Sequence, residues 1–518
     1  MAPTRTLWTR FATSAAAHGD RTALETGGHR LTYEQVRAAA GHVARALHTA
    51  PSPARRVGVI ADRTVTSYAA YLAVQRLGGT AVPLNAAWPR QRRELVARAA
   101  GLDVAVADEE ASAELPGDVP VLRFGSGGLA RAAAPEDLPP HTADPDAFAY
   151  LLFTSGSTGA PKGVPVRHRN ADAYLADVAA RYRPGPGSRV SQTFDLTFDP
   201  SVFDLFVGWS SGATVVVPGR DALLDPVGFV TEQRITHWFS VPSLVSLAGR
   251  LRRLRPDAMP DLRQSLFAGE PLTLDQARAW HAAAPRSTID NLYGPTELTV
   301  TITGYRLPAR PEHWPRTSNG TVPIGEVHAG HDAVVLDARM RHADEGELAV
   351  RGPQRFPGYL RAADNADRFV AADPQGGPAH RSGGGTDGGA GEVPEDWYYR
   401  TGDRVRREEG ALVHLGRVDD QVKVHGYRVE LGEIEAALRA HPDVRDAIVV
   451  ALPDPRDQLE LRAAYTGAAE SGSVREVLRE KLPPYLVPLT VERLSALPLN
   501  GNGKIDRRAV ARSLQHTA

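Results

Sequence analysis

Phe153-Thr-Ser-Gly-Ser-Thr-Gly-Ala-Pro-Lys-Gly163 is a loop sequence dense in glycine and hydroxyl side chains, and it directly follows the apolar run Phe148-Ala-Tyr-Leu-Leu152. Glycines permit tight turns that bring backbone N–H groups against an anion, and Ser and Thr hydroxyls add further donors. Lys162 supplies a compact positive charge beside them. The sequence therefore predicts a phosphate-binding loop with the candidate contacts Thr154, Ser155, Gly156, Ser157, Thr158, Gly159 and Lys162.

The spacing of this loop differs from that of a Walker loop. A Walker loop places Ser or Thr directly after its lysine to hold magnesium, whereas Gly163 follows Lys162 here. A Ser/Thr/Gly run alone is most often a flexible linker, and the attached Pro161-Lys162-Gly163 argues against that interpretation. A magnesium ligand must then come from elsewhere. The candidate is Asn291-Leu-Tyr-Gly-Pro-Thr-Glu297, which combines a tight Gly-Pro turn with the carboxylate of Glu297.

Length and composition predict at least two folded domains, because 518 residues exceed a single core and 42% of them are hydrophobic. The 60 Lys and Arg residues balance 61 Asp and Glu residues, which argues against binding nucleic acid or an anionic membrane through bulk charge. No apolar stretch reaches the ~18 residues of a membrane span, and residues 1–20 lack the apolar middle of a secretory signal, so we expect a cytoplasmic protein. The chain has no cysteine, so any thiol in the reaction must come from another molecule.

Hydrophobic periodicity predicts a large α/β domain followed by a small α+β domain. Short apolar runs alternate with Ala/Leu/Arg-rich helical stretches over the first two-thirds of the chain, which is typical of parallel sheets covered by helices. The expected strands include 56–61, 79–84 and 213–218, and the expected helices include 68–77 and 89–100. Later the pattern shortens to a helix at 431–440, a strand at 446–451 and a helix near 474–481, which predicts a compact lid.

We expect an N-terminal core over residues 1–418 and a mobile C-terminal lid over residues 419–518. Residues 372–395 contain Gly-Gly-Pro and Gly-Gly-Gly-Thr-Asp-Gly-Gly-Ala-Gly with almost no apolar side chains. Nothing there can offset the entropy of ordering, so we expect a disordered surface insertion.

An ordered series of motifs resembles the superfamily of adenylate-forming enzymes, which includes acyl-CoA synthetases, luciferases and the amino-acid adenylation domains of nonribosomal peptide synthesis. The resemblance covers nearly the whole chain, and the order of its blocks makes it specific. Besides the two segments above, the blocks are Leu31-Thr-Tyr-Glu-Gln-Val36, Leu77-Gly-Gly-Thr-Ala-Val-Pro-Leu84, Gly346-Glu-Leu-Ala-Val-Arg-Gly352, Tyr399-Arg-Thr-Gly-Asp403, Gly416-Arg-Val-Asp-Asp-Gln-Val-Lys-Val-His-Gly426, Leu482-Pro-Pro-Tyr-Leu-Val-Pro488 and Asn500-Gly-Asn-Gly-Lys-Ile-Asp506.

The resemblance implies a site for ATP and Mg²⁺. In this superfamily the loop from Thr154 to Lys162 wraps the leaving phosphates, Glu297 binds magnesium and Thr296 contacts the α-phosphate. Asp403 accepts the ribose hydroxyls and Arg417 closes on the same sugar; the flanking motif favours this role for Asp403 over a turn cap. The other implied nucleotide contacts are Gly269, Glu270, Asn291, Tyr293 and Gly294.

The resemblance also implies a lid that serves two half-reactions. Lys504 would bridge the substrate carboxylate and the α-phosphate and neutralise charge in the transition state, whereas without this context it would be a solvated surface lysine. Asp419 stands at the hinge, although alone it would be an ordinary loop carboxylate. After adenylation the lid rotates, withdraws Lys504 and presents Gly426 to a phosphopantetheine thiol.

The segment Phe198-Asp-Pro-Ser-Val-Phe203 resembles the place where amino-acid adenylation domains bind the substrate α-ammonium, and it assigns that role to Asp199. The alternative is a cap for a helix beginning at Pro200. The other implied pocket residues carry no charge, which favours a small neutral substrate such as alanine, serine or glycine, with D-alanine and short β-amino acids left open. They are Pro200, Phe203, Ser240, Leu266, Ala268, Leu292, Val300 and Thr301.

The sequence therefore predicts an amino-acid adenylating ligase that loads a carrier protein. Few residues follow Arg507 and no Leu-Gly-Gly-[His/Asp]-Ser attachment motif occurs, so we expect a freestanding enzyme with its carrier protein in trans. The need for a small activating protein stays open. The alternatives are an acyl-CoA ligase for a small carboxylic acid and a non-catalytic nucleotide-binding relative. The second is disfavoured because Lys162, Glu297, Asp403 and Lys504 are all present.

Overall fold

The computed structural model describes residues 4–50, 55–111, 114–133, 138–142, 144–156, 161–219, 221–371, 380–381, 393–419, 421–424, 426–454, 459–498 and 505–515, and of residues 380–381 it describes only the backbone. Most of the expected insertion at 372–395 lies outside this part of the chain, so its disorder stays a prediction.

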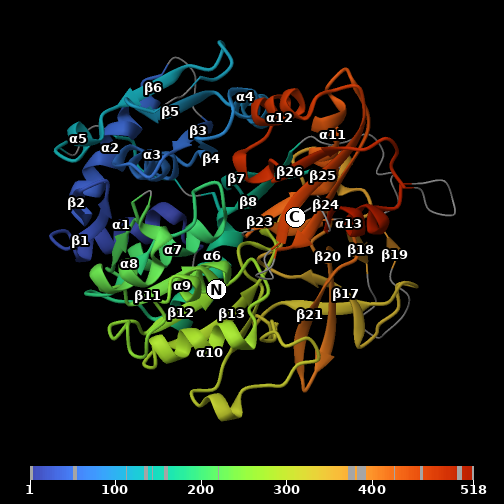
Figure 1. Cartoon of the computed structure of the whole chain (residues 1–518). Coiled ribbons are helices and arrows are strands. Elements are labelled where there is room, and N and C mark those ends of the chain that lie inside the picture. Colours follow the sequence, from blue (N-terminus) through green and yellow to red (C-terminus); the bar gives the residue numbers. More distant parts are fainter. Residues whose placement is uncertain are drawn as a thin grey trace.

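Two largely parallel sheets dominate the first two-thirds of the chain, as the sequence predicted (Figure 1). The first sheet has the order β6 (Val121–Phe124), β5 (Val104–Asp108), β3 (Arg56–Ala61), β4 (Thr80–Asn85), β7 (Phe148–Thr154) and β8 (Lys162–Arg167). The second has the order β15 (Glu326–Val327), β14 (Thr303–Arg306), β13 (Thr288–Tyr293), β12 (Gln264–Phe267), β11 (His237–Ser240), β9 (Arg189–Ser191), β10 (Thr214–Val216), β1 (Thr22–Thr26) and β2 (His29–Thr32). Antiparallel pairs occur only toward their edges.

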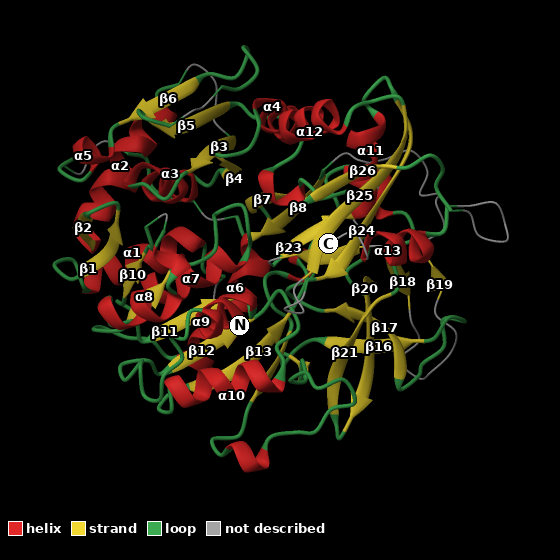
Figure 2. Cartoon of the chain, in the orientation of Figure 1, coloured by secondary structure: helices red, strands yellow, loops and turns green. Residues whose placement is uncertain are grey.

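Helices cover both sheets (Figure 2). They are α1 (Leu7–Ala17), α2 (Tyr33–His48), α3 (Val65–Arg76), α4 (Arg90–Ala100), α5 (Ser126–Leu129), α6 (His168–Tyr182), α7 (Pro200–Trp209), α8 (Pro226–Glu232), α9 (Ser243–Arg250) and α10 (Leu274–Ala283). Helix α2 begins with a capping box in which Thr32 and Gln35 exchange hydrogen bonds. Helix α3 is buried on almost every face and packs in the main core with Tyr33, Phe206 and Trp209.

A third sheet, in which every strand pair is antiparallel, is a feature that the sequence did not predict. Its strands are β16 (Asp332–Leu336), β17 (Glu345–Arg351), β20 (Tyr398–Glu408), β18 (Phe369–Ala371) and β19 (His380–Arg381), and β21 (Ala411–Arg417) pairs with β20. Register shifts interrupt the pairing of β20 with both β17 and β21, so these strands lack clean alternation of polar and apolar residues.

The C-terminal part has the expected small α+β architecture. The hairpin β22 (Gln421–Val424) and β23 (Tyr427–Glu430) precedes α11 (Leu431–Arg439), and β24 (Val444–Pro453), β25 (Leu459–Gly467) and β26 (Thr490–Arg493) form a sheet. Helices α12 (Ser471–Lys481) and α13 (Arg507–Gln515) complete it. The side chains of this part form a hydrophobic core of their own, with Ile434, Leu438 and Tyr465 among the buried residues. We call residues 421–515 the lid.

Candidate active site

A cavity of about 110 Å³ lies where the lid hairpin β22–β23 meets the ends of β7 and β13. Parallel sheets commonly bind ligands beyond the carboxyl ends of their strands. Of the predicted site residues, the cavity brings together Thr154, Ser155, Asp199, Pro200, Ala268, Gly269, Gly294, Thr296, Val300, Asp403 and Arg417. The cavity is thus lined by residues that are remote in the sequence. They come from the phosphate loop, the turn after β13, the third sheet and the lid hairpin.

The described part of the phosphate loop lies against the lid. Ser155 Oγ donates a hydrogen bond of 2.9 Å to the backbone carbonyl of Arg428 in β23. Lys162 is buried at the start of β8, with its Nζ 5.4 Å from the ring centre of Tyr359, and burial lowers the pKa of its ammonium group. Gly156 follows Ser155, whereas Ser157, Thr158 and Gly159 lie outside the described residues.

Glu297 is fully buried in the 3₁₀ turn η2 (Thr296–Leu298) and is already bound by protein groups. Arg428 Nη1 lies 2.8 Å from each carboxylate oxygen, and the Tyr359 hydroxyl donates to Oε1 at 2.5 Å. Burial acts to raise the pKa of Glu297, but the charge of Arg428 and the Tyr359 hydrogen bond outweigh it, so the net pKa lies below its ordinary value. The sequence reasoning missed both Arg428 and Tyr359.

Asp403 is held as a carboxylate by three side chains. Oδ2 accepts a hydrogen bond of 2.7 Å from the Tyr293 hydroxyl, and Oδ1 lies 3.0 Å from Arg417 Nη1 and 3.1 Å from His414 Nε2. Burial acts to raise the pKa of Asp403, but His414 and Arg417 hold it well below its ordinary value. Arg417 also bonds Asp419 at 2.7 and 2.9 Å, which links the predicted sugar site to the predicted hinge.

Two of the other predicted nucleotide contacts, Asn291 and Glu270, are held by hydrogen bonds to backbone groups. Asn291 Nδ2 donates to the carbonyls of Val322 and Pro323 at 2.9 and 3.0 Å, so the structure uses this amide to hold a neighbouring segment. Glu270 accepts a hydrogen bond of 2.8 Å from the Ser243 N–H, and Gly269 has a left-handed φ of 89°. The ammonium group of Lys423 lies 5.7 Å from the Tyr293 ring centre.

Asp199 stands at the N-cap position of α7, before Pro200, but its side chain makes no capping hydrogen bond to that helix. Instead Oδ2 accepts a hydrogen bond of 2.9 Å from the N–H of Val300, whose φ is 69°. Burial raises the pKa of Asp199 to about 6. The helix-cap alternative therefore does not describe the carboxylate, which lines the cavity.

The other predicted pocket residues leave little room beside Asp199. Pro200, Ala268 and Val300 line the cavity with it. Four more residues are buried but do not line the cavity: Phe203, Leu266, Leu292 and Thr301. Ser240 accepts a hydrogen bond of 2.8 Å from Trp238 Nε1 and lines a neighbouring groove instead.

That neighbouring groove, of about 530 Å³, is mostly apolar and reaches the cavity. Phe194, Phe198, Gly426 and Tyr427 line both spaces. The outer part of the groove is lined by Leu223, Leu224, Leu244, Leu247 and Arg250. We call it the apolar groove.

The lid is fixed to the large domain by several contacts around the cavity. The Phe198 and Tyr427 rings meet edge to face with centroids 4.8 Å apart, and Arg92 in α4 forms a buried ion pair with Glu433 in α11. Helix α12 contacts α4, and Figure 1 shows the two side by side. Lys504 lies outside the described residues; Arg507, which follows it, bonds Glu435 within the lid at 2.8 Å.

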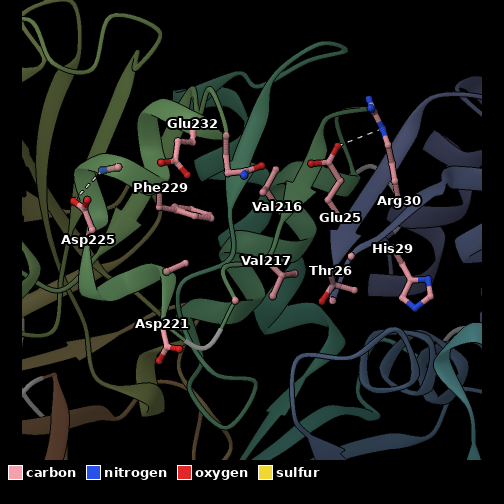
Figure 3. A pocket seen from close by; sticks show the side chains of 16 residues that line it. Glu25, Thr26, His29, Arg30, Val216, Val217, Asp221, Asp225, Phe229 and Glu232 are labelled. Atoms are coloured by element: carbon pink, nitrogen blue, oxygen red, sulfur yellow. Dashed lines mark hydrogen bonds and ion pairs between the residues drawn. The ribbon is translucent and has the colours of Figure 1, made fainter.

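A larger hollow of about 580 Å³, between the β1–β2 turn and α8, contains none of the predicted site residues (Figure 3). Two of its four carboxylates have partners already: Glu25 bonds Arg189 at 2.6 Å, and Asp225 bonds Arg253 at 2.5 Å and caps α8. Across the described ranges, no three His, Asp or Glu side chains are grouped to hold a metal ion, and no helix is long and apolar enough to cross a membrane.

Comparisons with known proteins place this geometry in a family. Residues 11–360 match the family model of the AMP-binding enzyme, and residues 433–504 match that of the AMP-binding enzyme C-terminal domain. Phosphinothricin tripeptide synthetase PhsC of Streptomyces viridochromogenes is 35% identical over 98% of this chain, which spans 45% of PhsC. The L-proline--[L-prolyl-carrier protein] ligase of Pseudomonas fluorescens is 35% identical over 72% of this chain and 70% of its own.

Solved structures agree. The crystal structure of IdnL7 is 38% identical, covers 99% of this chain and 100% of its own, and superposes with a TM-score of 0.69. The Vibrio cholerae adenylation domain AlmE, solved with glycyl-adenosine-5'-phosphate, is 25% identical, covers 100% of this chain and 98% of its own, and has a TM-score of 0.79. The chain belongs to the AMP-binding enzyme family and has the fold of an adenylation domain of the adenylate-forming superfamily.

Proposed function

We propose that this protein activates a small neutral amino acid with ATP and then transfers it to the phosphopantetheine thiol of a carrier protein. A substrate carboxylate oxygen attacks the α-phosphorus, the bond to the β-phosphate breaks, and pyrophosphate leaves. In the second step the thiol sulfur attacks the acyl carbon, the bond to AMP breaks, and the thiol proton is released. The observation that carries the proposal is the buried Asp199 in the cavity.

Asp199 supports an amino-acid substrate because its described partners are uncharged hydrogen-bond donors, Val300 N–H and the Thr296 side chain, and it has no ion pair among the described residues. A buried carboxylate without a cation is costly, and an α-ammonium group would supply the missing charge. The neutral side chains around it would leave a charged substrate side chain without a partner. The small volume beside Pro200, Ala268 and Val300 favours alanine, serine or glycine.

The nucleotide would lie across the opposite side of the cavity. Asp403 presents a carboxylate for ribose hydroxyls, Thr296 lines the same space, and Ser155 begins the loop proposed for the phosphates. Magnesium usually takes one or two protein carboxylates and completes its shell with substrate phosphates and water. The single carboxylate of Glu297 fits such an ion, which would neutralise phosphate charge when bound. We assign the transition-state contact to Lys504 on the resemblance of its motif alone.

The apolar groove supports a thiol acceptor on a long arm. It leads to Gly426 and Phe198, where the cavity begins, and a phosphopantetheine chain could follow it to the acyl group. A carrier-protein acceptor is further supported by the similarity to the L-proline--[L-prolyl-carrier protein] ligase of Pseudomonas fluorescens.

Amino-acid-dependent exchange of labelled pyrophosphate into ATP tests the proposal. We expect exchange with alanine, serine or glycine and none with acetate or propionate. Exchange only with acids that lack an amino group would contradict the role of Asp199. Thioester formation from the same acid with pantetheine, coenzyme A and a phosphopantetheinylated carrier then separates the carrier ligase from an acyl-CoA ligase, which would favour coenzyme A.

A further inference from the structure

Arg428 occupies both oxygens of the carboxylate that is proposed to bind magnesium. Its Nη1 lies 2.8 Å from Oε1 and 2.8 Å from Oε2 of Glu297, and Oε1 also accepts from Tyr359. Glu297 is fully buried, so solvent does not screen this pair. Magnesium requires near-ideal octahedral geometry with oxygen ligands at about 2.0–2.1 Å. A metal ion at Glu297 would compete with Arg428 for the same oxygens and repel its charge.

Arg428 reaches Glu297 from a lid hairpin that is docked on the large domain. The backbone carbonyl of Arg428 accepts from Ser155 in the phosphate loop, and the neighbouring Tyr427 packs on Phe198 of the large domain. Arg92 and Glu433 form a second buried ion pair between the two parts. A lid that undocks would therefore carry the guanidinium group away from Glu297.

We propose that Arg428 is a positioning residue that takes the place of the metal ion at Glu297, so that metal binding and lid docking exclude one another. This inference rests on the proposed adenylation function. While metal and phosphates are bound, the hairpin is held out of the cavity. When both leave, Glu297 needs a new cation, and Arg428 supplies it by bringing Gly426 to the cavity. Release of pyrophosphate thus becomes the signal for the second half-reaction.

The absence of cysteine from the chain allows a direct test of lid position. Ala99→Cys in α4 and Glu480→Cys in α12 place spin labels on exposed positions of two helices that contact each other when the lid is docked. Pulsed electron paramagnetic resonance then measures the docked population, with magnesium pyrophosphate as the probe. We expect magnesium pyrophosphate to lower the ratio of docked to undocked lids by about fivefold or more, the lower end of typical coupling between two sites.

Arg428→Met should abolish this response, because the docked lid would no longer exclude the metal. Arg92→Met is the matched control: it removes the other buried ion pair between the two parts, so it should lower docking at every metal concentration and keep the response. Arg428→Met leaves Glu297 unpaired and can destabilise the fold. The double variant Glu297→Gln/Arg428→Met restores a neutral pair and should show the same loss of response.

Two results would overturn the proposal: a lid distribution that magnesium pyrophosphate does not change in the labelled parent protein, or equal responses in the Arg428→Met and Arg92→Met proteins. The spin-label distances can be measured without any catalytic turnover. Loss of pyrophosphate exchange with every acid would instead contradict the proposed function itself. The two failures are therefore distinguishable.

Discussion

At Asp199, the burial that raises the pKa of the carboxyl group also prepares it to bind a cation. The N–H of Val300 donates to the carboxylate and helps to orient it without neutralising its charge. The left-handed backbone at Thr299 and Val300, with φ of 57° and 69°, directs that N–H toward the aspartate. The left-handed backbone of one loop thus orients a hydrogen-bond donor toward the carboxylate of another.

The raised pKa gives a pH dependence that can be measured. Binding of an α-ammonium group requires the ionised form of Asp199, which is present above its pKa of about 6 and is lost as the pH falls through that value. We therefore expect kcat/KM for the amino acid to fall below about pH 6, because kcat/KM reports ionisations of the free enzyme. The profile should be measured by amino-acid-dependent pyrophosphate exchange.

Asp199→Asn should remove this acid limb and lower kcat/KM for the amino acid by roughly 30-fold or more at neutral pH, since losing one partner of a buried charge pair costs at least ~2 kcal/mol. The KM for ATP should stay within about twofold. An unchanged acid limb in the variant would assign the ionisation to another group.

Motifs in the sequence identify individual candidate site residues. They do not predict contacts between side chains that come from remote segments. Asp199, Thr296, Asp403 and Arg417, which come from different motifs, all line one cavity, and their roles there stay predictions. Arg428 lies 131 residues from Glu297, and it is an unremarkable cation until the fold brings the two together.

The hairpin β22–β23 depends on a glycine at its tip. Gly426 has a φ of 80°, and a Cβ atom there would lie 2.4 Å from Val241 Cγ1. A glycine is therefore needed both for the left-handed backbone and for the close approach of the hairpin to the large domain. The β22–β23 hairpin can therefore pack closely against Val241 only because Gly426 has no side chain.

Gly426→Ala should uncouple the two half-reactions. We expect transfer to pantetheine to fall by about tenfold or more, because a left-handed alanine costs ~1 kcal/mol and the clash with Val241 adds to it. Pyrophosphate exchange should change by less than about twofold. Gly472→Ala is the control, since a Cβ at this glycine in α12 meets nothing within 4 Å. Equal loss in both half-reactions would argue against a docking role.

Periodicity predicted elements well where they are helical or fully buried. The strand expected at 56–61 has those bounds, and the helix expected at 431–440 ends one residue earlier. The third sheet was missed because irregular pairing along β20 breaks the alternation on which such predictions depend. That sheet carries Asp403, His414 and Arg417. The motifs therefore pointed to Asp403 and Arg417 as candidate site residues, although no hydrophobic pattern predicted the strands that carry them.

On the scale of the whole molecule, the proposed function requires the lid to take part in two reactions. Its β22–β23 hairpin faces the cavity in this structure, and Arg428, Gly426 and Tyr427 line the cavity. The resemblance assigns adenylation to Lys504, which belongs to another segment of the same lid. Each half-reaction would then use a different segment of the lid, in turn.

Lys504→Ala should therefore separate the steps. We expect pyrophosphate exchange to fall by roughly 10²-fold or more, as for loss of a transition-state charge contact. Transfer from a supplied aminoacyl adenylate to pantetheine should change by less than about threefold, which rapid-quench assays would measure. A matched loss of both steps would contradict a role confined to adenylation.

The separate hydrophobic core of the lid also bears on how such enzymes diversify. Its interior is complete without the large domain, and the groups that join the two parts include Arg92, Phe198 and Glu297 facing Glu433, Tyr427 and Arg428. The lid of a relative that preserves these contact residues could therefore replace this lid on the large domain. If the proposed function holds, recombination at one junction would exchange acceptor recognition and leave the amino-acid pocket unchanged.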